Sequence, residues 1–253
     1  MRVDRREFIG GTVTGALATT ATLGAGTVVA AHLKDPDEQG RTSFSEQGED
    51  IVLFHAVRDL LRLRTATYVD VGAAHPVLGN NTYLLYSLGG HGVLVEPNPA
   101  LAARLRTRRP RDRVVEAGVG VSEATEADYF VIKGNDMLNT FSPAQVAALE
   151  QARGEDPVER VLKMPLVALT RVITEQLGAA PDVLSTDVEG LDFDILQTLD
   201  FERQRPGVIC AESEWTTSAG AHSPLTAFLL AKGYVPRGGS LVNTIYVDGT
   251  RRR

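Results

Sequence analysis

The sequence predicts an α/β fold whose doubly wound, mostly parallel sheet ends in an antiparallel hairpin. Short apolar runs alternate with helical patterns through most of the chain, which is typical of βαβ units. The first such unit, residues 67–99, places an acid and a glycine after its first strand and an acid after its second. The last two expected strands, within residues 234–248, have no helix between them, which favours a hairpin.

The first 33 residues differ in composition from the rest of the chain. They contain the pair Arg5-Arg6, an uncharged segment from Phe8 to Ala31, and small residues at 29–31 that would suit cleavage. This pattern resembles a twin-arginine export signal, and its low content of Leu, Ile and Phe would make a weak permanent membrane span. The alternative is the unprocessed start of a cytosolic enzyme.

A polar linker separates this segment from the expected folded domain. Residues 34–41 read KDPDEQGR, which is a linker composition. We therefore expect an N-terminal segment and linker over residues 1–41 and one domain over residues 42–253.

Composition limits what this domain can be. The whole chain has 253 residues, of which 43% are apolar and 23% charged. It can bury one full α/β core and leaves no room for a second catalytic domain. The net charge of −6 argues against a nucleic-acid surface, so the basic run at residues 103–113 is interpreted as a solvated helix end and loop. Cys210 is the single cysteine, which excludes an internal disulfide and a thiolate metal cage.

The remaining elements follow from periodicity and from turn residues. Helices are expected within residues 43–63, at 99–109 and 143–153, before 177, at 191–201 and after Ser223. Further strands are expected at 92–95, 114–121, 128–133, 158–169, 183–188 and 208–212. Ser142, Pro143 and Gln145 predict a helix start with a capping box, and Pro165 predicts an edge or a bulge in its strand.

The turn after the first strand favours S-adenosylmethionine (SAM) over a dinucleotide. A dinucleotide site needs GxGxxG, but only Gly72 is present, because Ala74 and Val77 stand at the other two glycine positions. Asp70 would repel phosphates and would attract the ammonium and sulfonium groups of SAM. Glu96, at the end of the second strand, suits two adjacent ribose hydroxyls. The alternative is that Asp70 only caps the next turn and Glu96 is a solvated strand end.

Ordered blocks along residues 43–247 resemble the FkbM family of SAM-dependent methyltransferases. The blocks that carry the resemblance are SEQGED at 45–50, YVDVGAAHP and NNTYLLY at 68–86, GVLVEPNP at 92–99, LSTDVEGLDFDILQTLDF at 184–201, PGVICAES at 206–213 and NTIYVD at 243–248. The resemblance implies a Rossmann-like class I methyltransferase fold, SAM as the donor, and O-methylation of a hydroxyl on a sugar or other small metabolite.

The resemblance also implies roles for residues of these blocks. Asp70, Gly72 and Ala73 match the methionine-side loop, Glu96 matches the ribose acid with Asn98 nearby, Gly118 and Val119 match the adenine wall, and Asp187, Glu189 and Gly190 match the block beside the sulfonium and the acceptor. His75 and Pro76 depart from the pattern, because many members have a second glycine in this turn.

Methyl transfer to an alcohol is helped by a base within hydrogen-bond reach of the hydroxyl. The candidates are Asp187 and His75, followed by Glu189 and Glu212. Each has a structural alternative: His75 as a loop residue bonded to backbone, Glu189 as a first-turn acid, and Glu212 as a solvated strand end. Asp187 and Glu189, together with Asp136, would also suit Mg²⁺, although their spacing is a weak signal and no metal is assigned.

The acceptor is expected at the polar segment 132–142, where Asn135, Asp136 and Asn139 could bind hydroxyls. Two other functions fit parts of the sequence. A NAD-linked sugar oxidoreductase would share the βαβ unit and the ribose acid. An exported, non-catalytic glycan-binding protein would explain the twin arginines, whereas cytosolic SAM chemistry favours the cytoplasm.

Overall fold

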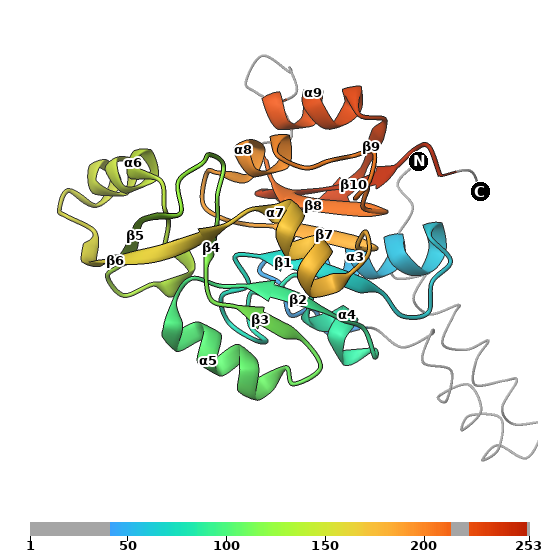
Figure 1. Ribbon diagram of the computed structural model, residues 1–253, viewed down its shortest axis with the longest axis horizontal. Helices are drawn as coiled ribbons and strands as arrows, with labels where there is room; N and C mark the ends of the chain where they lie inside the picture. Colours follow the sequence, from blue (N-terminus) through green and yellow to red (C-terminus); the bar gives the residue numbers. More distant parts are fainter. Residues whose placement is uncertain (1–40, 214–222, 252–253) are drawn as a thin grey trace, which may run out of the picture. The chain divides into compact units, whose positions relative to one another are not determined.

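The main sheet of the computed structural model has seven strands in the order β3-β2-β1-β7-β8-β10-β9. The structure describes residues 41–213 and 223–251, so the expected signal segment at 1–33 lies outside the described residues. The strands are β1 Thr67–Val71, β2 His91–Val95, β3 Arg113–Val115, β7 Val183–Thr186, β8 Val208–Glu212, β9 Tyr234–Gly239 and β10 Asn243–Asp248. Figure 1 shows them stacked in this order.

Strand directions confirm the predicted fold class. β3, β2, β1, β7 and β8 pair in parallel, while β10 pairs antiparallel with both β8 and β9. The parallel pairs bring the ends of β1, β2 and β7 to one edge of the sheet, where open α/β sheets bind their ligands.

A second sheet of three strands lies beside the main one (Figure 1). Its order is β4-β6-β5, with β4 at Gly118–Val119, β5 at Glu126–Ile132 and β6 at Val158–Val167. The strand expected at 114–121 is therefore divided between the two sheets as β3 and β4. β6 is the central strand, contrary to the expected edge, but β4 pairs only with Leu166 and Val167 and leaves Pro165 with β5 alone.

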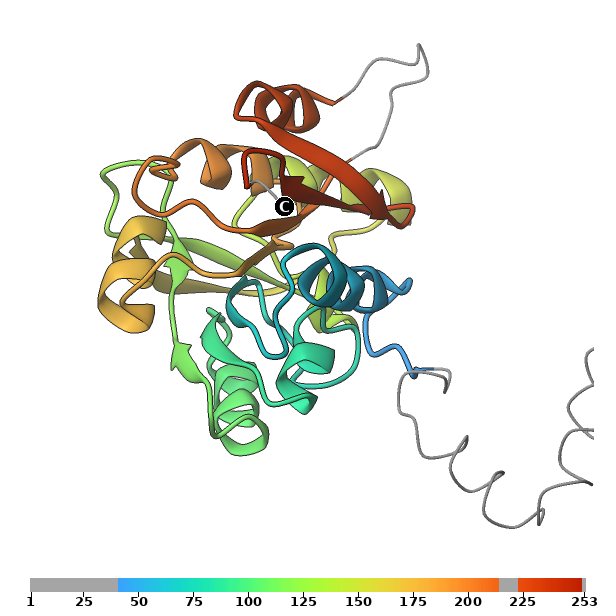
Figure 2. The same cartoon turned by 90° about the vertical axis from the view of Figure 1, so that its right-hand side faces the viewer.

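Helices cover both faces of the main sheet. One face carries α3 Glu49–His55 with the π-helical segment Ala56–Leu60, α4 Tyr83–Ser87 and α5 Pro99–Arg108, and the other carries α7 Leu169–Arg171 with the π-helical segment Val172–Leu177, α8 Asp192–Gln197 and α9 Pro224–Ala231. The helix α6, Pro143–Arg153, lies beside the small sheet (Figure 1). A 3₁₀ turn spans Asp136–Leu138. Figure 2 shows α3 and α7 on opposite sides of the strands. No helix in the described ranges has the length and apolar character needed to cross a bilayer.

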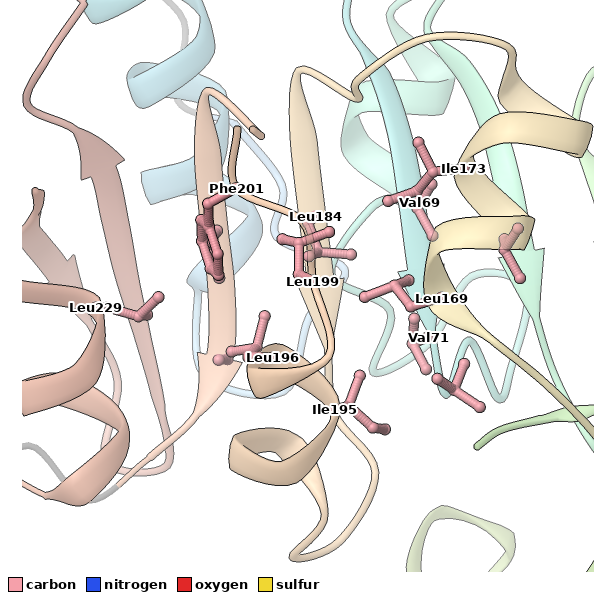
Figure 3. Close-up of a cluster of buried hydrophobic side chains, with 14 of the residues drawn as sticks. Val69, Val71, Leu169, Ile173, Leu184, Ile195, Leu196, Leu199, Phe201 and Leu229 are labelled. Atoms are coloured by element: carbon pink, nitrogen blue, oxygen red, sulfur yellow. The ribbon is translucent and has the colours of Figure 1, made fainter. Parts of the chain in front are cut away.

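Alternation along the strands builds two separate cores. On one face, Val69 and Val71 pack with α7, α8 and α9 through residues such as Leu169, Ile195 and Leu229 (Figure 3). On the other face, strand residues including Tyr68 pack with α3, α4 and α5. Successive β1 residues thus face different helix layers, which decides where Asp70 points.

Ser142 confirms the predicted start of α6. Its side chain accepts a hydrogen bond from the backbone N–H of Gln145 at 3.2 Å, and Pro143 occupies the first turn. The second half of the expected capping box is not made, because the Gln145 amide donates instead to Glu189 at 3.0 Å. This contact ties α6 to the loop after β7.

Candidate functional site

A cavity lies at the ends of β1, β2 and β7 and is closed on its other side by the small sheet. The groups that line it come from the loops after these strands, from β4 and β5, and from the start of α8: Val71, Gly72, Ala74, Val95, Glu96, Pro97, Ala117, Gly118, Val119, Tyr129, Asp136, Met137, Asn139, Thr140, Phe141, Asp187, Val188, Leu191 and Ile195. We call it the main cavity. It brings together five of the ten predicted site residues: Gly72, Glu96, Gly118, Val119 and Asp187.

Gly72, in the loop after β1, lies against the backbone of the loop after β7. Its φ of +82° favours glycine, and a Cβ atom added to it would lie 2.1 Å from the backbone oxygen of Asp187. The backbone N–H groups of Gly72 and Ala73 donate to the Val95 carbonyl at 3.0 and 3.2 Å. The turn is therefore fixed by backbone contacts to both neighbouring strands. The Ala73 side chain is buried in the core formed with α3, α4 and α5 and does not line the cavity.

Glu96 presents a buried carboxylate to the main cavity. Its two oxygens accept backbone N–H bonds from Asn98 at 2.7 Å and from Ala74 at 2.8 Å. Burial raises the pKa of Glu96 to about 7, against the lowering effect of these two bonds. Each oxygen keeps a lone pair that a ligand hydroxyl could use. Asn98 does not line the cavity; its side chain caps α5 by accepting from Ala100 N–H at 3.0 Å.

The wall opposite Glu96 is apolar and aromatic. Gly118 leaves space for the Phe141 ring, which a Cβ atom at this position would approach to 2.5 Å. Tyr129 packs on Phe141 with ring centroids 4.8 Å apart. Together with Val119, these groups form an apolar, aromatic wall against which a planar ring system could pack. Sequence reasoning located Gly118 and Val119 but missed both aromatic residues, which come from distant positions in the chain.

Asp187 ends β7 and places its carboxylate in the main cavity. It accepts hydrogen bonds from the side-chain amides of Asn243 at 3.0 Å and Asn81 at 3.5 Å. Burial, together with the negative charges of Glu212 and other acids, raises the pKa of Asp187 to about 7, against the lowering effect of the Asn243 bond. Sequence reasoning missed both asparagines. They belong to the quoted blocks NNTYLLY and NTIYVD, so the resemblance offered the only signal for them.

Glu189 lies next to this site but does not line the main cavity. Its backbone is in the left-handed region, with a φ of +55°. Its carboxylate accepts a hydrogen bond from the side-chain amide of Gln145 at 3.0 Å. Its carbonyl also accepts from the Thr140 hydroxyl at 3.2 Å. Burial, followed by the charge of Glu212, raises the pKa of Glu189 to about 7. The geometry makes Glu189 a link between the loop after β7 and the wall built by Thr140 and α6.

Asp70 does not line the main cavity either. It is buried on the same face of β1 as Tyr68, toward α3, α4 and α5. There it accepts a hydrogen bond from the Thr82 hydroxyl at 2.6 Å and a long one from the Asn80 amide at 3.5 Å. The same Asn80 amide donates to the Ala73 carbonyl at 2.9 Å. Because β1 side chains alternate, Asp70 points away from the cavity that Val71 lines. This geometry differs from the expected direct contact with the ligand, because the Asp70 carboxylate is bonded to Thr82 and Asn80.

Arg109 anchors the network around Asp70. Its guanidinium is fully buried and donates to Asp112 at 2.7 Å, Asn80 and Thr82 at 2.9 Å, and the Tyr68 hydroxyl at 3.0 Å. The interpretation of residues 103–113 as a solvated run is therefore wrong at Arg109.

His75 lies in a side hollow next to the main cavity. This hollow also contains Glu46, Leu78, Arg104 and Asp136, and it shares Ala74, Asp136 and Met137 with the main cavity. The ring Nδ1 accepts backbone N–H bonds from Val77 at 3.1 Å and Leu78 at 2.8 Å. The neutral ring therefore carries its proton on Nε2 and presents a donor, which is poorly suited to taking a proton from a substrate.

The polar segment 132–142 contributes unequally to the site. Asp136 and Asn139 line the main cavity, whereas Asn135 caps the 3₁₀ turn by accepting from Met137 N–H at 3.0 Å. The Asn139 side-chain oxygen accepts from Ile132 N–H at 2.8 Å, so only its amide nitrogen is free for a ligand. Within the described ranges, no cluster of three His, Cys, Asp or Glu residues is arranged to hold a metal ion.

Comparisons with known proteins identify one family model and several solved structures that are similar to this chain. A family model described as the methyltransferase FkbM domain matches residues 70–236, which is more than half of the chain. No curated protein matches. Solved structures similar to this chain include an O-methyltransferase from Bacillus cereus in complex with SAH (15% identity, 87% of each chain, TM-score 0.38). Another is a TehB-like SAM-dependent methyltransferase from Corynebacterium glutamicum (10% identity, 88% of this chain and 97% of that chain, TM-score 0.40).

Proposed function

The chain belongs to the FkbM family of SAM-dependent methyltransferases, and we propose that it methylates a hydroxyl oxygen on a sugar or another small metabolite. The family uses SAM, so the alternative of a NAD-linked oxidoreductase, which shares the first βαβ unit, is set aside. The acceptor atom is our proposal. It is carried by one observation, a buried carboxylate, Asp187, that lines the main cavity with a pKa of about 7.

The residues of the main cavity fit SAM. Glu96 offers two carboxylate oxygens to a ribose diol, and Gly118, Val119 and Phe141 offer an apolar surface to an adenine ring. The turn at Gly72 lies close to the backbone of Asp187, the proposed base for the acceptor. We propose that these residues hold SAM and that Ala73, Asp70 and Asn98 support the two loops without touching it.

SAM supplies an electrophilic methyl group, and its transfer to an alcohol releases the hydroxyl proton. Asp187 is placed to accept this proton, since a base with a pKa near the working pH is the most effective. Asn243 and Asn81 hold the carboxylate in one orientation. Glu189 is bonded to Gln145 and stands behind the cavity wall, so we assign it a positioning role. His75 presents an N–H to the side hollow and is not the base in this proposal.

The test is methyl transfer by the full chain from ¹³C-methyl-labelled SAM to a panel of hydroxylated sugars and metabolites. The ¹³C shift of the product distinguishes a methyl group on oxygen from one on nitrogen. Asp187→Asn keeps the shape of the side chain but removes the base, so kcat is expected to fall by roughly 10²- to 10⁴-fold. The Kd of SAM, measured by calorimetry, is expected to change by less than about threefold.

The matched control is Asp194→Asn on the exposed side of α8. It is expected to retain wild-type kcat and SAM affinity. Methylation of nitrogen, or an Asp187→Asn variant with undiminished kcat, would contradict the proposal. The twin-arginine segment and the compartment in which the protein works stay predictions, because residues 1–40 lie outside the described ranges.

A further inference from the structure

We infer that the acceptor is a phosphorylated sugar, and that Arg104, Arg108 and the Nε2–H of His75 hold its phosphate beside the main cavity. The inference rests on the proposed function, because it specifies the acceptor of that same site. It is carried by three hollows that share lining residues, by two arginines without partners among the described residues, and by the fixed hydrogen bonds of His75.

Three hollows that share lining residues lie in series from the main cavity to α5, and we call this series the path. The side hollow shares Ala74, Asp136 and Met137 with the main cavity. At its outer end it opens into a groove, which we call the outer groove, lined by residues 75–78 and by Ala103, Arg104, Thr107 and Arg108 of α5. His75, Leu78 and Arg104 line both the side hollow and the outer groove. The inferred acceptor extends from Asp187 across these neighbouring hollows to α5.

Two cations of α5 face the outer groove without a counter-ion. Arg104 and Arg108 are exposed and, within the described part of the chain, form neither an ion pair nor a side-chain hydrogen bond. They are four residues apart, so they share one helix face and repel each other. Arg106, on the same helix, is instead paired with Glu116 at 2.8 Å. An anion bound between Arg104 and Arg108 would relieve their repulsion and gain charge-assisted hydrogen bonds.

His75 adds a neutral donor to these two charges. Its Nδ1 is occupied by the backbone N–H groups of Val77 and Leu78, so Nε2 carries the proton. Burial and the nearby Arg104 and Arg108 lower the pKa of His75, which keeps the ring neutral with that tautomer. A donor next to two guanidinium groups is a combination that suits the oxygens of a phosphate.

The charges change sign along the path. The side hollow contains the carboxylates of Glu46 and Asp136 together with Arg104, whereas the described residues that line the outer groove include Arg104 and Arg108 and no carboxylate. Acids accept hydrogen bonds from sugar hydroxyls and repel a phosphate, so a phosphorylated sugar is oriented with its hydroxyls inward and its phosphate outward. This orientation directs a hydroxyl toward Asp187 in the main cavity.

The subsite is tested first with inorganic phosphate on the full, ¹⁵N-labelled chain. Long-range ¹H–¹⁵N spectra report the His75 tautomer and follow its ring signals during a phosphate titration at constant ionic strength. A saturable shift is expected in the wild type and in the control Arg106→Gln, with loss of at least about tenfold in affinity in Arg104→Gln/Arg108→Gln. No saturable shift in the wild type, or an equal shift in the double variant, would overturn the inference.

The carboxylate of SAM is another anion, so the Kd of SAM is measured by calorimetry in the same variants. Unchanged SAM affinity in Arg104→Gln/Arg108→Gln supports a subsite for the acceptor. A loss of SAM affinity of about tenfold would assign these arginines to the methyl donor and overturn the inference.

The second test uses turnover with a small-molecule extract of cells, before and after treatment with phosphatase. The aqueous and organic phases are assayed separately, which distinguishes a soluble sugar phosphate from a phosphorylated lipid headgroup. SAM-dependent turnover is expected to fall at least about tenfold after phosphatase treatment and in Arg104→Gln/Arg108→Gln, and to persist in Arg106→Gln.

Undiminished turnover after phosphatase treatment would overturn the inference while leaving the proposed methyl transfer intact. Saturable phosphate binding without any SAM-dependent turnover would instead support the subsite and contradict the proposed function. The two failures are therefore distinguishable.

Discussion

Asp70 and Asp187 occupy neighbouring strands and have similar sequence surroundings, but they serve different regions of the molecule. Asp70 belongs to a buried network in which the Thr82 hydroxyl donates to it and Arg109 supplies positive charge. Asp187 faces the main cavity, and the charges nearest to it come from other acids, with Glu212 the strongest. The comparison teaches that a compensated acid holds a fold together, whereas an uncompensated one near a cavity is available for proton chemistry.

The largest expected effect is loss of the compensating cation. Arg109→Met removes the group that binds Asp112, Asn80, Thr82 and Tyr68 and leaves Asp70 and Asp112 buried without it. The free energy of unfolding is expected to fall by roughly 3–5 kcal/mol, as measured by urea denaturation. The control Arg106→Gln breaks an exposed pair and is expected to cost less than about 1 kcal/mol. Equal stabilities for the two variants would show that the network does not hold the fold.

A second prediction concerns Gly72, which connects the two regions. Gly72→Ala forces a Cβ atom against the Asp187 carbonyl, whereas the same change at Gly178 meets no atom within 4 Å. Both residues have positive φ, +82° and +85°, so the backbone strain is matched. Gly178→Ala is expected to cost about 1 kcal/mol, and Gly72→Ala more than about 2 kcal/mol together with most of kcat. Similar unfolding free energies in the two variants would argue against this close contact.

Much of the fold could be predicted from the sequence, because it depends on local signals. The alternation of strands and helices, the acid after β2 and the Ser142 cap are all visible within short windows. The expected contact of Asp70 with the ligand did not follow this strand period: Val71 lines the cavity, so period two turns Asp70 to the opposite face. The helix boundaries were less accessible: α8 covers Asp192–Gln197, whereas a helix was expected over residues 191–201.

The rest of the site depends on contacts between distant residues. Asn243 meets Asp187 across 56 positions of the chain, and Asn81 meets it across 106. Arg109 lies in a run of arginines that are otherwise exposed, and only its tertiary partners distinguish it. The role of His75 likewise depends on which of its nitrogens the loop occupies, which no sequence pattern reveals.

A third prediction concerns Asp192, a buried acid near Asp187 and Glu212. Burial and the charge of Asp187 raise the pKa of Asp192 to about 8, against 3.8 for the ordinary side chain. The folded state thus keeps a proton that the unfolded state releases, and stability falls as the pH rises from about 4 to about 8. Asp192→Asn removes this titration. It is expected to stabilise the protein at pH 8 relative to the wild type by about 2 kcal/mol, and by less at pH 5.

The measurement is urea denaturation of both proteins between pH 5 and pH 8. Asp70 provides the contrast, because the charge of Arg109 opposes the rise in its pKa that burial causes, whereas no cation of the described residues acts on Asp192 in this way. A difference between wild type and Asp192→Asn that does not grow with pH would place the pH sensitivity elsewhere.

The smallest expected effect is a displacement of the pH profile of kcat. A base with a pKa of about 7 is protonated below that pH, so wild-type kcat is expected to fall about tenfold per pH unit on the acid side and to level off above pH 7. Glu212 raises the pKa of Asp187 through its charge. Glu212→Gln removes that charge, so the midpoint is expected to move to lower pH while the plateau stays similar. An unmoved midpoint would mean that burial alone sets the pKa of Asp187, and a shift to higher pH would exclude Asp187 as the titrating base.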